Sequence, residues 1–190
     1  MLDNKKLLIE GAGTNDTWVW RDVEFTDFSV KATYNFLLGE EPAEYKDMFV
    51  KFWKLKTLPS KQFTTWRVLT NTIATKENLL RHGISLLCDH YPLCDVDEET
   101  IRHNFFECRV SWRIWGMCLE WLRFSSVFHC DAQMHFKMFK LLGLKHATIR
   151  CWGGIWVGII GEIWNYINRV VFKNVRVDLV EVFILVQMKT

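Results

Sequence analysis

The sequence predicts a mainly α-helical fold, with a small β-hairpin near the N-terminus, a cysteine- and histidine-rich loop in the middle and a helical C-terminal tail. Apolar residues recur at helical spacing through most of the chain, and these runs are preceded by residues that cap helices, namely Ser29, Thr75, Asp131 and Asp178. In "DTWVWRDVEFTDFSV" apolar and polar residues alternate instead, which predicts two short strands confined to residues 17–30. With 49% hydrophobic residues and three prolines, the composition indicates a folded core and not a disordered chain.

The first predicted helices follow in order along the chain. Ser29 caps a helix that Gly39 ends, and a second helix runs through "KDMFVKFWKL". Pro59 begins the helix in "PSKQFTTWRVLTNTI", because the first turn of a helix does not need the backbone donor that proline lacks. Thr75 caps the short helix in "KENLLRHG", which Gly83 ends.

The second half of the chain contains longer apolar helices. In "RVSWRIWGMCLEWLRF" one helical stripe is predicted to face the core, made of Trp112, Trp115, Leu119 and Leu122. Asp131 caps "AQMHFKMFKLLG", and two further helices are predicted at 147–173 and 178–189. Residues 152–172 are the most apolar, but their uncharged run stops at Glu162, short of the roughly 20 residues of a membrane span. A buried helix is therefore expected there.

Composition and the N-terminal sequence bear on compartment and partners. The net charge of +2 is too small to indicate a nucleic-acid partner by itself. The segment "MLDNKKLLIEGAG" lacks the basic residues before an apolar run and the cleavage context of a signal peptide. We therefore expect an intracellular protein, in the nucleus or the cytoplasm, that is neither secreted nor bound to a membrane. In a reducing compartment, its six cysteines indicate metal binding more than disulfides.

The stretch "CDHYPLCDVDEETIRHNFFEC" carries the strongest chemical signal. Three of its residues have the spacing C-x8-H-x4-C: Cys94, His103 and Cys108. Thiolates and imidazoles are the ligands that zinc prefers, so a zinc-knuckle-like loop is predicted. A fourth ligand is expected shortly before Cys94, where both Cys88 and His90 qualify, and we favour Cys88. The alternative is that the two cysteines are small buried residues and that His103 is a surface residue.

The other thiols and imidazoles lack such spacing. Cys118, Cys130 and Cys151 are expected to be core thiols, and His129, His135 and His146 solvated helix residues. The chain contains no nucleophile elbow, phosphate-binding glycine loop or HExxH motif, so no catalytic residue is predicted. The acidic run "DVDEE" beside the cluster would repel phosphate, which favours a structural zinc.

A basic and aromatic segment forms a second candidate site. Residues 46–82 contain eight basic residues against two acidic ones, and the aromatic residues among them are Trp53, Phe63 and Trp66. Such a mixture is typical of surfaces that hold a nucleic-acid backbone and stack its bases. The predicted contacts are Lys51, Lys54, Lys56, Lys61 and Arg67. The alternative is a solvated basic helix face over an aromatic core.

Three ordered segments resemble a known family: "FSVKATY", "FWKLKTLPSKQFTTWRVLTNTIATKENLLRHGI" and "CDVDEETIRHNFFECRVSWRIW". They resemble the reverse-transcriptase zinc-binding domain, which lies downstream of the polymerase in plant non-LTR retrotransposons. The resemblance spans roughly residues 16–121. It implies a domain at 1–125, followed by a helical C-terminal extension at 126–190.

The resemblance implies a non-catalytic zinc-binding module derived from a retrotransposon reverse transcriptase polyprotein, with Zn²⁺ as cofactor. The implied partners are RNA or DNA, bound weakly and without sequence preference, and a reverse transcriptase polypeptide. Ligand roles carry over to Cys94, His103 and Cys108. The family's first zinc cysteine falls on Tyr91 in this chain, so a weak or lost zinc site is expected unless Cys88 or His90 substitutes. The alternative function is a degenerate fragment that serves as a structural or protein-interaction remnant.

Overall fold

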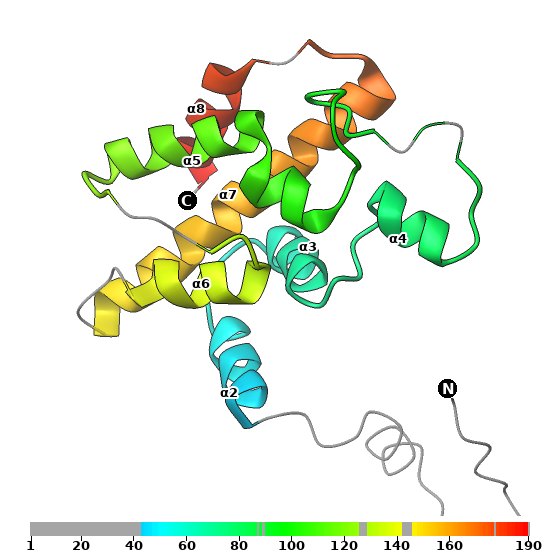
Figure 1. Ribbon diagram of the computed structural model, residues 1–190. Coiled ribbons are helices and arrows are strands. Elements are labelled where there is room, and N and C mark those ends of the chain that lie inside the picture. Colours follow the sequence, from blue (N-terminus) through cyan, green and yellow to red (C-terminus); the bar gives the residue numbers. More distant parts are fainter. Residues whose placement is uncertain are drawn as a thin grey trace, which may run out of the picture. The chain divides into compact units, whose positions relative to one another are not determined.

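The computed structural model describes residues 43–86, 88, 90–125, 129–141, 146–176 and 178–189. Contacts divide the chain into two units, residues 1–50 and 51–190. The helices in Figure 1 are α2 (Ala43–Phe52), α3 (Pro59–Leu69), α4 (Lys76–Arg81), α5 (Arg109–Trp121), α6 (Ala132–Leu141), α7 (His146–Lys173) and α8 (Leu179–Lys189). A π-helical segment, η1 (His103–Glu107), precedes α5.

The mainly helical fold class is confirmed. The described residues contain no strand, only an isolated antiparallel bridge between His90 and Glu98. The hairpin predicted at 17–30 and the helix predicted after Ser29 lie outside the described residues. The boundary predicted between residues 125 and 126 falls inside the second unit, where α5 packs against α8, and it stays a prediction.

The predicted helix starts are confirmed at three caps. Thr75 Oγ1 accepts a hydrogen bond from Asn78 N at 3.3 Å, Asp131 Oδ1 accepts one from Met134 N at 2.9 Å, and Asp178 Oδ1 accepts one from Val180 N at 2.9 Å. Each bond satisfies a backbone donor that the first turn of a helix leaves without a partner. Pro59 is the first residue of α3, as predicted.

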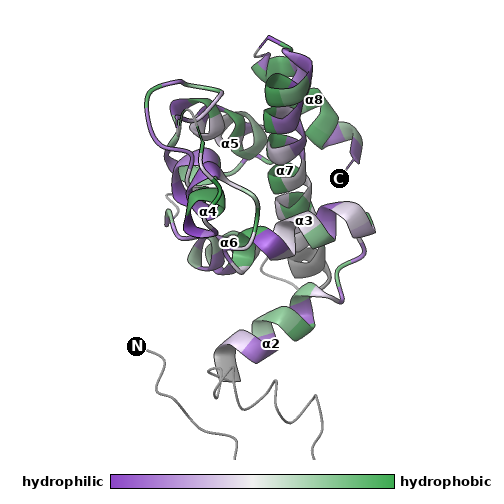
Figure 2. Cartoon of the chain, turned by 90° about the vertical axis from the view of Figure 1, so that its right-hand side faces the viewer, coloured by the Kyte–Doolittle hydropathy of each residue, from purple (hydrophilic) through white to green (hydrophobic). Residues whose placement is uncertain are grey.

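The long helix α7 forms the centre of the second unit. α3, α6 and α8 pack against it, and Figure 1 shows it passing α6 and α3 as its colour changes from yellow to orange. Its fully buried side chains include Trp156, Val157, Ile159, Ile160, Ile163 and Ile167. The apolar residues of α7 and α8 appear green in Figure 2. The helix predicted at 152–172 is confirmed and its middle is buried, whereas Val171 and Phe172 near its end are exposed. None of the described helices has the length and apolar character needed to cross a membrane.

Two glycines of α7 let the start of α3 and the chain before it come close to α7. A β-carbon at Gly153 would lie 2.9 Å from Leu55 Cδ2, and one at Gly161 would lie 3.0 Å from Lys61 Cγ. Side chains larger than hydrogen would push these neighbours away, because a packed core has little free space. The glycines therefore fix the position of residues 55–61 on α7.

An ion cluster around a buried carboxylate joins three helices. Glu162 of α7 is 2% exposed, and its Oε1 lies 2.6 Å from Lys61 Nζ of α3 and 3.2 Å from Lys189 Nζ of α8. Burying a carboxylate is unfavourable unless it is paired, so the two ammonium groups offset the cost of placing Glu162 in the core.

His135 is a core residue, which corrects the expectation of a solvated side chain. It is 3% exposed, and its Nδ1 accepts a hydrogen bond from Trp156 Nε1 at 2.9 Å. The rings of Phe106 and Trp115 lie 4.7 and 4.5 Å from its own. Burial lowers the pKa of His135 to about 3, so the imidazole is neutral at physiological pH.

Two further expectations about side-chain placement are corrected. Trp115 of the predicted α5 stripe is buried, but Trp112 is 68% exposed, because α5 packs through the face formed by Ser111, Ile114, Trp115 and Cys118. Among the expected core thiols, Cys118 is buried, Cys130 is half-buried and Cys151 is exposed.

We expect Glu162→Gln to lower the free energy of unfolding by about 3 kcal/mol, because it leaves the buried ammonium group of Lys61 without a carboxylate. Urea denaturation at neutral pH would measure this loss. The matched control is Glu181→Gln, which breaks a partly exposed ion pair with Arg169 and should cost much less. Equal losses in the two variants would contradict the role assigned to Glu162.

We also expect His135 to make the fold less stable as the pH falls below about 6.5. The unfolded chain takes up a proton at His135 near pH 6.5, whereas the folded chain does so only near pH 3. The contribution of His135 to the free energy of unfolding is therefore fully present above pH 6.5. It decreases by up to about 1.4 kcal/mol per pH unit as the pH falls toward 3. Burial raises the pKa of Glu99 to about 7, which gives the opposite slope between pH 4.5 and 7.

The His135 contribution is isolated by comparing a variant with the unmodified protein. His135→Gln should flatten the dependence of unfolding free energy on pH between 6.5 and 4, because the folded and unfolded chains then no longer differ in proton binding at this position. Identical slopes for the His135→Gln and unmodified proteins would disprove the assignment.

Candidate metal centre

The three residues with C-x8-H-x4-C spacing converge in the structure. The ligand atoms of Cys94, His103 and Cys108 all lie within 4.8 Å of one another, and Cys94 Sγ is 3.2 Å from His103 Nε2. Cys94 and His103 are half-buried, and Cys108 is 1% exposed. Two sulfur donors and one imidazole nitrogen thus face a common point.

A compact turn positions Cys94. The carbonyl oxygen of Tyr91 accepts hydrogen bonds from Cys94 N at 3.3 Å and Asp95 N at 2.8 Å, and Tyr91 N donates to Asp97 O at 2.7 Å. Asp95 has a positive φ of 52°, a conformation that Asp and Asn adopt more readily than most residues. The turn therefore directs Cys94 back toward His103.

The π-helical segment η1 aligns the other two residues. Cys108 N donates to His103 O at 2.9 Å, which closes one wide turn over the four residues between them. Cys108 then caps α5, since its sulfur accepts a hydrogen bond from Val110 N at 3.4 Å. Trp115 Nε1 donates to Phe105 O at 2.7 Å and ties the π-helical turn to α5. Single π turns occur often at functional sites.

His103 is held from two other sides. Its Nδ1 lies 3.5 Å from Asp97 Oδ2, so the carboxylate faces the ring nitrogen opposite to the one near Cys94. The ring of Tyr91 packs edge-on against the imidazole, with centroids 5.3 Å apart. A carboxylate on the outer nitrogen of a histidine orients the ring toward a metal. Sequence reasoning missed this contact, although Asp97 stands in the conspicuous acidic run.

Tyr91 stands where the resemblance expects the first zinc cysteine, and its side chain packs in the core. It is fully buried, and its hydroxyl donates to Asn104 O at 3.3 Å. Burial raises the pKa of Tyr91 well above its ordinary value, so the phenol keeps its proton and does not act as an anionic ligand.

The donor set fits zinc. Tetrahedral zinc with bonds of about 2.0–2.3 Å places neighbouring ligand atoms roughly 3.5–3.8 Å apart, which a cluster within 4.8 Å reaches by small side-chain shifts. Burial raises the pKa of the Cys108 thiol, and the neighbouring Cys94 adds to the rise. Two adjacent thiolates therefore need a cation between them, which zinc would supply.

The two candidates for the fourth ligand, Cys88 and His90, lie outside the cluster of Cys94, His103 and Cys108. Cys88 is exposed, and neither Cys88 nor His90 belongs to the cluster among the described residues. His90 is exposed, and its carbonyl oxygen accepts a hydrogen bond from Lys76 Nζ at 2.7 Å. The assignment of Cys88 as fourth ligand stays a prediction.

The basic segment places three of its five predicted contact residues on the surface: Lys51, Lys54 and Lys56 are exposed. Trp53 and Phe63 beside them are 49% and 52% exposed. The half-buried Trp66 joins these two rings, with centroid distances of 6.2 Å to Trp53 and 5.6 Å to Phe63. We call this group the lysine–aromatic surface.

The other two predicted contacts serve the fold. Lys61 is 6% exposed and pairs with Glu162, so its charge does not reach the surface. The half-buried Arg67 donates from Nε and Nη2 to Thr72 O, at 3.2 and 2.8 Å, and holds the turn after α3. Sequence alone could not reveal either arrangement, because a charged residue in a basic run looks the same whether it is paired or free.

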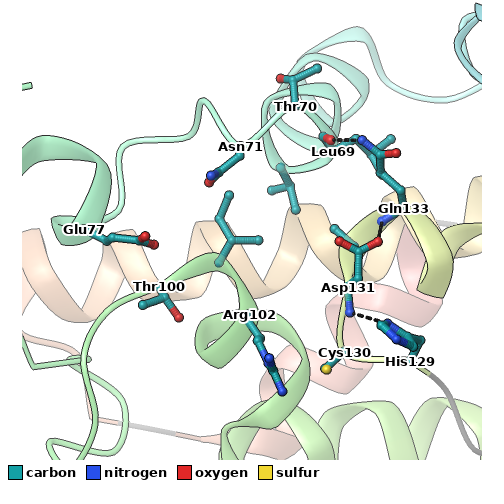
Figure 3. Close-up of a pocket in the computed structure, with 13 residues that line it drawn as sticks. Leu69, Thr70, Asn71, Glu77, Thr100, Arg102, His129, Cys130, Asp131 and Gln133 are labelled. Carbon is teal, nitrogen blue, oxygen red and sulfur yellow. Dashed lines mark hydrogen bonds between the residues drawn. The ribbon is translucent and has the colours of Figure 1, made fainter. Parts of the chain in front are cut away.

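A separate polar cavity of about 540 Å³ lies between the end of α3 and the start of α6 (Figure 3). Several of its polar groups already have protein partners, although the buried Gln133 Oε1 has none among the described residues. Gln133 Nε2 donates to Leu69 O, Asp131 caps α6, and Arg102 pairs with Glu107. We therefore assign no ligand to it.

The comparisons with known proteins bear on this centre. Residues 28–115 match the family described as zinc-binding in reverse transcriptase. This match confirms the resemblance found in the sequence. It covers Cys94, His103 and Cys108, together with Tyr91 and the lysine–aromatic surface. No curated protein and no solved structure matches the chain.

Proposed function

We propose that the chain is a non-catalytic zinc-binding module of reverse-transcriptase origin that binds RNA or DNA weakly and without sequence preference. The observation that carries the proposal is the convergence of Cys94, His103 and Cys108 inside the segment that matches the zinc-binding family. The zinc is structural, because it would join the turn before η1 to the start of α5.

Zinc would be held by Cys94, His103 and Cys108, with Asp97 orienting the imidazole. When bound, it supplies a cation that neutralises two thiolates and cross-links residues on either side of η1. The buried Tyr91 leaves the fourth position to Cys88, to His90 or to water, and with water there the affinity is lower than in a site with four protein ligands.

Nucleic-acid binding is supported by the lysine–aromatic surface. Three exposed ammonium groups can contact phosphates, and the exposed rings of Trp53 and Phe63 can stack on bases. Neither kind of contact reads sequence, so binding would be weak and general. A reverse transcriptase polypeptide is the proposed protein partner, because the matched domain takes its description from such enzymes.

The non-catalytic role is supported by the same family match, which is to the zinc-binding part of reverse transcriptases. A structural or protein-interaction remnant is the second candidate, and the replacement of the family's first cysteine by Tyr91 favours it. Metal content and nucleic-acid affinity distinguish the two candidates.

We expect the purified protein to bind about one zinc ion, and Cys94→Ser to lose it, because a thiolate ligand is removed. Tyr91→Cys should raise zinc affinity at least roughly tenfold by adding a third thiolate as the fourth ligand, although it removes a buried ring. Competition with a chromogenic chelator would measure both changes.

The control for the zinc experiment is Cys151→Ser, which removes an exposed thiol outside the cluster and should leave zinc affinity unchanged. Cys88→Ser tests the fourth position: reduced affinity assigns it to Cys88, and unchanged affinity assigns it to His90 or water, which His90→Ala then distinguishes. A zinc content near zero in both the unmodified protein and Tyr91→Cys would favour the remnant.

We expect Lys54→Gln combined with Lys56→Gln to weaken binding to all oligonucleotide sequences alike, because both ammonium groups are exposed. If each contacts one phosphate of a single strand, the slope of log affinity against log salt falls by about 1.4. Fluorescence anisotropy with a labelled single strand at several salt concentrations would measure the slope.

The matched control removes two exposed positive charges elsewhere, with Lys173→Gln and Arg176→Gln near the end of α7. Equal effects of the two double variants would indicate attraction by net charge alone. No binding by the unmodified protein at low salt would reject the nucleic-acid role.

A further inference from the structure

The outward face of α5 combines an exposed tryptophan with arginines. The inward face packs against η1 and α8 through Ser111, Ile114, Trp115 and Cys118. The opposite side exposes Arg109, Trp112, Arg113, Gly116 and Glu120, and Arg123 is exposed two residues after the helix ends. We call these six residues the α5 outer face. It begins directly after Cys108, so it belongs to the helix that the metal centre anchors.

Trp112 is the most exposed tryptophan in the described part of the chain, at 68%. A helix normally covers part of such a ring with the side chain four residues later. Here that residue is Gly116, where an added β-carbon would meet no atom within 4 Å. Glycine inside a helix costs about 1 kcal/mol relative to alanine. Packing does not require this glycine, and its effect is to leave the indole ring open on that side.

The arginines of the α5 outer face are available for a ligand. In the described part of the chain, Arg109, Arg113 and Arg123 have no ion-pair partner, whereas Arg102 and Arg169 each pair with a glutamate. Glu120 is the only acidic residue of this face. Arg109 and Arg113 are four residues apart, so their side chains leave the helix about one turn apart, next to Trp112.

We propose that the α5 outer face is a second contact site for single-stranded nucleic acid, with a base stacked on Trp112 and phosphates held by Arg109 and Arg113. The positive charge selects a polyanion, and an exposed indole ring adds stacking with any unpaired base. A duplex cannot offer this stacking, because its bases are already stacked on each other. This inference rests on the proposed nucleic-acid role, but it uses residues separate from the lysine–aromatic surface.

The test measures the affinity of the full chain for a labelled 15-residue oligo(U) strand and for a 15-base-pair duplex at low salt. Trp112→Leu keeps an apolar side chain but removes the ring, and should weaken single-strand binding about tenfold, with little effect on the duplex. Trp112→Phe keeps a ring and should retain most of the affinity. Arg109→Gln combined with Arg113→Gln should weaken both complexes and lower the salt slope.

Gly116→Leu distinguishes an effect on nucleic-acid binding from an effect on folding stability, because the two are expected to change in opposite directions. It should raise the melting temperature, because leucine favours a helix more than glycine does. It should also weaken single-strand binding, because the new side chain covers the indole ring. Phe172→Leu is the matched control, since it removes a ring that is 78% exposed at the end of α7, and it should leave affinity unchanged.

The outcomes distinguish this inference from the proposed function. If Lys54→Gln with Lys56→Gln weakens binding while the α5 variants bind like the unmodified protein, the α5 site is rejected and the proposed function stands. If the unmodified protein binds no oligonucleotide at low salt, both are rejected. If Trp112→Leu alters only the sedimentation of the protein alone, the α5 outer face serves self-association, and the inference is overturned.

Discussion

The buried carboxylate of Glu162 is the interaction on which the rest of the second unit depends. It pairs with Lys61 of α3 and with Lys189 of α8, so one group on α7 fixes helices that are far apart in the sequence. A single unpaired charge at this depth would cost several kcal/mol, and the three helices therefore have to assemble together. Gly161, beside Glu162, leaves space for the stem of Lys61. The lysine–aromatic surface is consequently carried on a rigid support.

Cys108 connects the metal centre to the helix that follows it. Its sulfur belongs to the Cys/His cluster and also caps α5, and its backbone nitrogen closes the π turn from His103. A change at the cluster is therefore transmitted directly to the start of α5. The same helix buries Trp115 among the rings around His135 and presents Trp112 outward. One short segment thus links a structural site, the core and a charged surface.

Sequence reasoning predicted the features that depend on local order. Helix starts follow from single caps such as Thr75 and Asp131, and the spacing of Cys94, His103 and Cys108 identified a cluster that the fold does bring together. Sequence reasoning failed where a side chain is buried by a residue that lies far away in the sequence. Lys61 is buried by Glu162, a residue one hundred and one positions later, and His135 is buried by Trp156 of another helix.

The hydrophobic pattern of α5 also could not predict which tryptophan is buried. Trp112 and Trp115 are both apolar and lie on adjoining parts of the helix surface. Only the packing against η1 and α8 decides which of them is buried. The buried Tyr91 has a consequence of another kind. Since this ring and its hydrogen bonds tie the turn to the backbone of η1, zinc would bind to a turn that protein contacts already order in part. Exchanging such a ring for a metal ligand would replace a hydrophobic contact by a coordinate bond, and the stability of the turn would then depend on the concentration of free zinc.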